Sequence, residues 1–205
     1  MRLGIFGGTF DPVHQGHLLL AERCREQAAL DTVWFVPAAV SPHKQEHPPA
    51  SAEARADMLE LAVAGNDAFA VYRDEIERGG VSYTVDTLRR MQETHPDAEL
   101  FFLMGADSLE SLPTWREPEE ICRLATVVAI NRGGAPEPDF DVLRPVCDAD
   151  RIESFRRVQV TMGAMEISST DVRRRVAEGK SIRYQTPRAV EQYIRTHRLY
   201  QPPAE

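Results

Sequence analysis

Two histidines stand three residues apart near the start of the chain, in the stretch GGTFDPVHQGHL at residues 7–18. Imidazole N–H groups can donate hydrogen bonds to phosphate oxygens, and His14 and His17 are well spaced to do so together. Gly16, between them, would let a ligand approach the backbone closely. A helix beginning near Gly16 would add the partial positive charge of its N-terminus. The spacing therefore predicts a site for an anion, in particular a phosphate group.

Two other interpretations of the histidine pair stay open. A metal site would need a third ligand, for which Asp11 is the nearest candidate. In the second alternative, both histidines only cap a helix and bind no ligand. The phosphate interpretation is favoured over both because the free N–H groups and the dipole of a helix beginning near Gly16 already favour an anion beside the two imidazoles.

That second stretch is ISSTDVR, at residues 167–173. Ser168, Ser169 and Thr170 are residue types that favour helix N-caps, and Asp171 suits a first helical turn. Arg173 follows with a planar guanidinium that can bind a phosphate through two parallel hydrogen bonds. The simpler alternative is an ordinary capped helix with a solvated arginine.

The distribution of apolar residues predicts the strands and helices that must position these candidate phosphate contacts. Near-continuous apolar strands alternating with helices indicate a doubly wound, Rossmann-like α/β fold, with a parallel sheet, helices on both faces and a C-terminal helical segment. Ligands in such sheets bind beyond the carboxyl ends of the strands, where GGTFDPVH, SPHK and GADS are expected. We expect strands at 2–6, 32–37, 68–72, 99–104, 125–130 and 158–162, and helices at 16–28, 52–64, 83–94, 117–124, 169–178 and 187–196, with a short helix after Asp107.

Length and composition restrict the class of protein. The 205 residues predict a single domain over 1–205, with 165–200 as a helical C-terminal part that carries the second phosphate motif. The three cysteines include no CxxC pair, which disfavours a disulfide framework or zinc ribbon. The net charge of −8 disfavours a nucleic-acid partner. The segment 133–157, rich in proline and acidic residues, matches no motif.

The apolar runs of the sequence indicate where in the cell the protein is expected. None approaches the length of about 18 residues that spans a bilayer, and the N-terminus does not have the pattern of a secretory signal peptide. We therefore expect a cytoplasmic protein without a membrane partner. The oligomeric state stays open, with a homo-oligomer as one alternative.

The stretch GGTFDPVHQGH resembles the HxGH signature of the nucleotidyltransferase superfamily. The whole chain resembles one of its families, the bacterial nicotinate-nucleotide adenylyltransferases. The similarity covers nearly the full length and keeps the family's order through SPHK (41–44), SYTVDTL (82–88), FLMGADSLESLPTW (102–115), ISSTDVR (167–173) and PRAVEQYIRTHRLY (187–200). It implies transfer of AMP from ATP to nicotinate mononucleotide, with Mg²⁺ on the ATP phosphates, to give nicotinate adenine dinucleotide and pyrophosphate.

The resemblance also implies roles for individual residues. Catalytic donors at the phosphates would be His14, His17, Lys44 and Arg173, where Lys44 enters through the family's HK pair, here His43-Lys44. The ATP site would comprise Gly7, Gly8, Thr9, Phe10, Gly16, Gly105, Asp107, Ile167, Ser168, Ser169 and Thr170. The nicotinate nucleotide would contact Lys44, Ser82, Tyr83, Thr84 and Trp115, with no metal held by the protein itself. Arg55 is a weaker candidate for a phosphate contact.

Elementary chemistry agrees with this reaction. The attacking group is a phosphate monoester, largely dianionic at neutral pH because its second pKa is about 6, so no general base is needed. Positioning and cationic donors should supply the catalysis.

Three rival functions stay in view. The first is the same chemistry on nicotinamide mononucleotide or phosphopantetheine, and the second is a non-catalytic nucleotide sensor. The third, a dehydrogenase, is disfavoured because no GxGxxG follows the first strand and Pro37 ends the second strand where an acidic residue is expected.

Overall fold

The computed structural model describes residues 1–40, 50–134 and 136–202. Their centre is a parallel sheet of six strands in the order β3-β2-β1-β4-β5-β6. This order confirms the predicted doubly wound fold, with β1 and β4 as neighbours at the point where the winding reverses. The strands are β1 Arg2–Gly8, β2 Thr32–Pro37, β3 Phe69–Val71, β4 Glu99–Gly105, β5 Ala125–Arg132 and β6 Val160–Met162.

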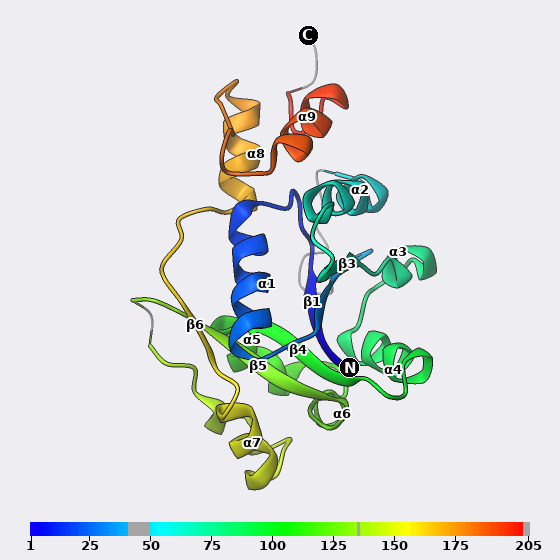
Figure 1. Ribbon diagram of the computed structural model, residues 1–205, viewed down its shortest axis with the longest axis vertical. Helices are drawn as coiled ribbons and strands as arrows, with labels where there is room; N and C mark the ends of the chain where they lie inside the picture. The colour runs from blue at the N-terminus through cyan, green and yellow to red at the C-terminus, as the bar shows by residue number, and fades with distance from the viewer. Residues whose placement is uncertain (41–49, 135, 203–205) are drawn as a thin grey trace.

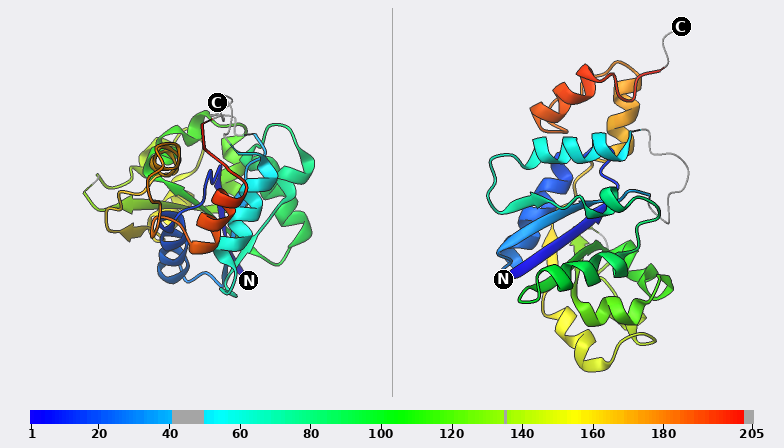
Figure 2. Two further views of the ribbon diagram at one scale, coloured as in Figure 1. Left: turned by 90° about the horizontal axis from the view of Figure 1, so that it is seen from above. Right: turned by 90° about the vertical axis from the view of Figure 1, so that its right-hand side faces the viewer.

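Helices cover both faces of the sheet, as the right-hand view of Figure 2 shows. The first face carries α1 (Gln15–Gln27) and α2 (Ala52–Val63), together with α8 (Ser169–Ala177) and α9 (Arg188–Thr196). The opposite face carries α4 (Thr84–Thr94), α5 (Ala106–Ser111), α6 (Pro118–Leu124) and α7 (Ala149–Arg156). Strand β4 serves both cores, because Phe101 and Leu103 face the first and Leu100, Phe102 and Met104 face the second.

Every strand and helix predicted from the sequence is present, with ends shifted by a few residues. Over the described ranges, four further elements were not predicted: α3 (Asp74–Arg78), α7 and two short 3₁₀ helices, η1 (Leu112–Thr114) and η2 (Phe140–Leu143). Two of them lie in the unassigned segment 133–157. Phe140 and Phe155 from that segment are buried in the second core, so it completes this core.

The C-terminal helices lie at one end of the molecule, beside α2 and the start of α1 (Figure 1). Val172 of α8 and Val190 and Ile194 of α9 are buried in the first core. This packing brings the second predicted phosphate motif to the loop that follows β1. Among the described residues, no helix has the length and apolar character needed to cross a membrane.

Candidate active site

The histidine pair forms the start of α1. His14 is the N-cap residue, and its ring stacks on that of His17 with centroids 3.7 Å apart. The backbone N–H of His14 donates to Nδ1 of His17 at 3.2 Å. Because this bond needs a lone pair on Nδ1, the ring hydrogen of a neutral His17 imidazole is assigned to Nε2. The structure thus fits the capping and the phosphate interpretations together.

Gly16 and Phe10, both predicted to contact ATP, have packing roles in the structure. A side chain at Gly16 would approach the His14 ring to 3.0 Å, so this glycine makes room for the imidazole. Phe10 is 3% exposed and its ring meets that of His17 edge-on, with centroids 5.0 Å apart. The Phe10 side chain therefore faces the core, and any contact of this residue with ATP would involve its backbone.

The start of α8 is docked onto the loop after β1. Ser168 caps the helix by accepting from the Asp171 N–H at 3.1 Å, and Ser169 Oγ donates to the Pro12 carbonyl at 2.9 Å. Arg173 Nη1 donates to the Asp11 carbonyl at 2.7 Å, and Nη2 contacts Thr170 Oγ1 at 3.3 Å. Arg173 is therefore half-buried beside the histidine loop, which argues against the solvated alternative.

The sequence predicted that the first backbone N–H groups of α1 would be available to an anion, but the first of them already has a partner in the protein. Gln15 N–H donates to the Gln185 carbonyl at 2.8 Å, in the turn between α8 and α9. The donors left for an anion at this helix are therefore fewer than the sequence suggested, and the histidine rings become correspondingly more important.

Asp11 does not complete a metal site with the histidines. It is 3% exposed, and Tyr200 OH donates to its Oδ1 at 2.6 Å. Burial raises the pKa of Asp11, while the hydrogen bond from Tyr200 and the nearby Arg173 lower it in part. Within residues 1–40, 50–134 and 136–202, no group of three or more His, Cys, Asp or Glu side chains could hold a metal ion.

Arg55, considered from the sequence as a phosphate contact, is fully buried. Its guanidinium donates to the carbonyls of Thr9 at 2.7 Å, Ala38 at 2.7 Å and Ala39 at 3.2 Å. Burial lowers the pKa of Arg55, and the charge of Asp11 raises it in part. This side chain ties the loop after β1 to the loop after β2, and the phosphate interpretation of Arg55 was wrong.

A cavity of about 520 Å³ opens where these loops meet the starts of α4 and α5. It brings together predicted residues of both nucleotides: Gly7, Gly8, Thr9, Asp107, Ser82, Tyr83, Thr84 and Trp115. Trp115 is held by a hydrogen bond from Nε1 to Ser111 Oγ at 3.1 Å and by an edge-on contact with Phe102, with centroids 6.1 Å apart. Its half-buried ring therefore forms part of the cavity wall.

The SYT stretch forms another part of this wall. Ser82 is 9% exposed, and its Oγ accepts from the Ala39 N–H at 3.0 Å, so its side chain has a structural role. Tyr83 is the N-cap of α4 and Thr84 its first residue. Among the described groups, none accepts from the backbone N–H of Tyr83 or Thr84, which leaves two donors at the cavity.

Glu75 is a cavity residue that the sequence analysis did not find. It is 7% exposed and accepts from Thr87 Oγ1 at 2.5 Å, with a further bond from Ser82. Burial raises the pKa of this carboxyl, and the two hydroxyl donors lower it in part. No motif marks Glu75, since it lies in a short helix of ordinary charged residues.

The other predicted residues have simpler outcomes. Gly105 is the N-cap of α5, Asp107 is exposed in its first turn, and Ile167 precedes the cap of α8. Lys44 and the adjacent His43 lie outside the described residues. The structure therefore groups the predicted residues around two neighbouring places, the loop–helix junction at His14 and the cavity.

Residues 5–175 match the family model described as cytidylyltransferase-like. This match places the doubly wound sheet and its histidine loop among the nucleotidyltransferases. A protein of Thermus thermophilus, named probable nicotinate-nucleotide adenylyltransferase, is 48% identical over 200 residues, covering 98% of this chain and 100% of the relative. A protein of Rhodopirellula baltica with the same name is 43% identical over 198 residues, covering 97% and 92%. The chain belongs to the nicotinate-nucleotide adenylyltransferase family.

Solved structures agree on the fold. The Plasmodium falciparum nicotinic acid mononucleotide adenylyltransferase, complexed with NaAD, superposes with a TM-score of 0.71 at 18% identity, covering 97% of both chains. A structure of the same enzyme complexed with APC gives a TM-score of 0.70 at 17% identity, covering 97% of this chain and 96% of that one.

Proposed function

We propose that this chain transfers AMP from ATP to nicotinate mononucleotide, releasing pyrophosphate and forming nicotinate adenine dinucleotide for NAD biosynthesis. The observation that carries the proposal is the cavity of about 520 Å³, which has an aromatic wall at Trp115 and two backbone donors at the start of α4. It opens beside the glycine loop that leads to the histidine pair. The cavity is thereby suited to a pyridine nucleotide, and the adjoining histidine loop is suited to the triphosphate of ATP.

The ATP phosphates would lie between the starts of α1 and α8. His17 can donate from Nε2, and Arg173 is fixed beside the same loop by its bond of 2.7 Å to the Asp11 carbonyl. His14, stacked on His17, would hold the other ring in place and add its own donor. Such donors favour the transition state because negative charge grows on the phosphate oxygens as the pyrophosphate leaves.

The chemical step needs little from the protein besides positioning. The acceptor's phosphate oxygen attacks the α-phosphorus of ATP, the bond from this phosphorus to the bridging oxygen breaks, and pyrophosphate departs with the electron pair. Since the attacking phosphate is already largely dianionic, no side chain has to remove a proton. The junction between the cavity and the histidine loop would bring the two polyanions into line.

We further propose that Mg²⁺ enters as part of the substrate MgATP. The predicted phosphate contacts are imidazole, hydroxyl and guanidinium groups, which bind phosphate oxygens, whereas Mg²⁺ prefers oxygen ligands and keeps several waters. Bound to the triphosphate, the ion would neutralise charge on the leaving pyrophosphate. Lys44, through the family's HK pair, is proposed as a further cation at the phosphates.

The nicotinate ring would stack on Trp115, with its carboxylate at the N–H groups of Tyr83 and Thr84. A carboxylate offers acceptor oxygens to both donors, whereas a carboxamide can place an NH₂ against one of them. The lost charged hydrogen bond and the unpaired N–H are each worth about 1–3 kcal/mol. The site should therefore prefer the acid over the amide.

A comparison of acceptors tests this proposal. Purified protein and MgATP are incubated with nicotinate mononucleotide, nicotinamide mononucleotide or phosphopantetheine, and pyrophosphate release is measured with each. We expect the largest kcat/KM with nicotinate mononucleotide. Trp115→Ala should weaken binding of both pyridine nucleotides without reversing their order, because stacking treats the two rings nearly alike. Equal kcat/KM values for the two would contradict the proposed role of the SYT stretch.

A further inference from the structure

One cationic side chain, that of Arg116, lines the cavity within the part of the chain that the structure describes, and it takes no part in the AMP transfer proposed above. Arg116 follows Trp115 directly, and its guanidinium lies over the Tyr83 ring, 4.7 Å from the centroid. Its side chain is 52% exposed, so it stands at the rim where solvent and ligand both have access. The other charged residues that line the cavity are Glu75 and Asp107.

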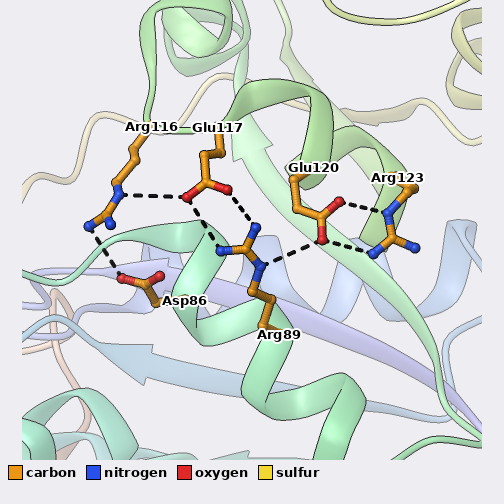
Figure 3. A network of polar contacts seen from close by, with 6 residues as sticks. All are labelled: Asp86, Arg89, Arg116, Glu117, Glu120 and Arg123. Carbon is orange, nitrogen blue, oxygen red and sulfur yellow. Dashed lines mark hydrogen bonds and ion pairs between the residues drawn. The ribbon is translucent and has the colours of Figure 1, made fainter.

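The acidic neighbours of Arg116 do not saturate its guanidinium. Asp86 Oδ2 and Glu117 Oε1 each lie 3.7 Å from a guanidinium nitrogen, too far for good hydrogen bonds (Figure 3). Glu117 is instead bound at both oxygens by Arg89, at 3.3 and 2.5 Å. Arg116 is thus oriented by two ion pairs and an aromatic face, while its N–H donors can still serve a ligand.

The position of Arg116 is fixed by the ion-pair network drawn in Figure 3. Glu117 has φ of 50° and ψ of 58°, a left-handed backbone that is unfavourable for a residue with a side chain. The Arg89–Glu117 pair binds this turn to α4, and Arg89 also reaches Glu120 of α6 at 3.5 Å. The network therefore holds the Trp115–Arg116 turn against the helix whose first residues provide the proposed carboxylate donors.

We propose that Arg116 is a specificity-determining residue, whose guanidinium makes the cavity select an acceptor with a carboxylate on its aromatic ring over the matching carboxamide. The inference rests on the proposed function and deepens it. The N–H groups of Tyr83 and Thr84 distinguish acid from amide by hydrogen-bond direction. Arg116 adds a charge interaction that a neutral carboxamide does not receive.

The buried carboxyl of Glu75 does not cancel this charge. Burial raises its pKa, which favours the neutral form, and its hydrogen bonds run to Thr87 and Ser82. Asp107 is exposed to solvent in the first turn of α5, and the sequence assigns it to the ATP site and not to the nicotinate site. Arg116 is therefore the described side chain that can give the ring end of the cavity a positive potential.

The test compares acid and amide acceptors in two Arg116 variants. Arg116→Gln keeps hydrogen-bond donors but removes the charge, whereas Arg116→Lys keeps the charge. We expect Arg116→Gln to lower kcat/KM for nicotinate mononucleotide by about fivefold, the upper end of what one exposed charge contact contributes. In Arg116→Gln, kcat/KM for nicotinamide mononucleotide and KM for ATP should stay within about twofold of the unaltered protein. Arg116→Lys should keep most of the preference for the acid over the amide.

Arg123→Gln is the matched control, because Arg123 pairs with Glu120 at 2.6 Å at the far end of the same network. It should leave the acid preference unchanged, and thermal unfolding of all variants checks that they fold. If Arg116→Gln lowers kcat/KM for both acceptors equally, or keeps the full preference, the role of Arg116 is refuted while the proposed function stands. If the unaltered protein adenylylates neither acceptor, the proposed function and this inference both fail.

Discussion

Arg55→Met is the substitution whose effect the structure predicts most sharply. The fully buried guanidinium donates to three backbone carbonyls, at 2.7, 2.7 and 3.2 Å. Hydrogen bonds to a charged group contribute about 1.5–3 kcal/mol each, but relaxation and the retained methionine volume reduce the simple sum. Breaking one side of a buried charged arrangement usually destabilises by about 3–5 kcal/mol. We therefore expect Arg55→Met to lower the free energy of unfolding by about 3–5 kcal/mol.

Thermal and denaturant unfolding measure this effect. For a chain of this size, 1 kcal/mol shifts Tm by about 2–4 °C, so Tm should fall by about 6–20 °C. Arg73→Met is the matched control. Arg73 pairs with Asp57 and Glu60 on the outer side of α2, the helix that contains Arg55, and such a surface ion pair contributes up to about 1 kcal/mol. An Arg55→Met protein with unchanged Tm and a raised KM for ATP would refute the structural role and restore a ligand contact.

Three further changes test other parts of the site. His17→Ala should lower kcat by about 10²–10³-fold, as loss of one transition-state donor does; near-normal kcat in pyrophosphate release would exclude that role. Arg173→Lys keeps the charge but loses the planar fork, so KM for ATP or kcat should worsen by about tenfold; unchanged values would leave Arg173 as a structural residue. The raised pKa of the buried Glu75 carboxyl means that ionisation above pH 4.5 is less favourable in the folded state than in the unfolded state, so the free energy of unfolding should fall as pH rises. Glu75→Gln should make this fall smaller, and an unchanged pH profile of the unfolding free energy would contradict this prediction.

The sheet could be predicted because each strand is a short apolar run bounded by polar turns. ELFFLM, for example, has apolar residues at consecutive positions because both faces of β4 are buried. The approach of the Arg173 helix to the loop that precedes His14 was also predictable, since both motifs begin helices expected at the carboxyl edge of one sheet. These predictions depend on local patterns and on general rules of parallel sheets.

The tertiary partners of charged residues could not be predicted in the same way. Arg55 lies in a helix of mixed composition, and only the folded chain brings the carbonyls of Thr9 and Ala38 to it. Tyr200 bonds Asp11 across 189 positions of sequence, a contact that no local pattern encodes. The segment 133–157 was obscured by proline and acidic residues, although Phe140 and Phe155 belong to the core.

The proposed reaction transfers AMP, and no other part of ATP, to a nicotinate nucleotide. ATP labelled in the α-phosphate or in the γ-phosphate is incubated with the protein, Mg²⁺ and nicotinate mononucleotide, and the products are separated. We expect the α-label to enter the dinucleotide and the γ-label to be recovered as pyrophosphate, and both outcomes should depend on the acceptor. Transfer of γ-label to the acceptor, or pyrophosphate release that does not need the acceptor, would contradict the proposed reaction.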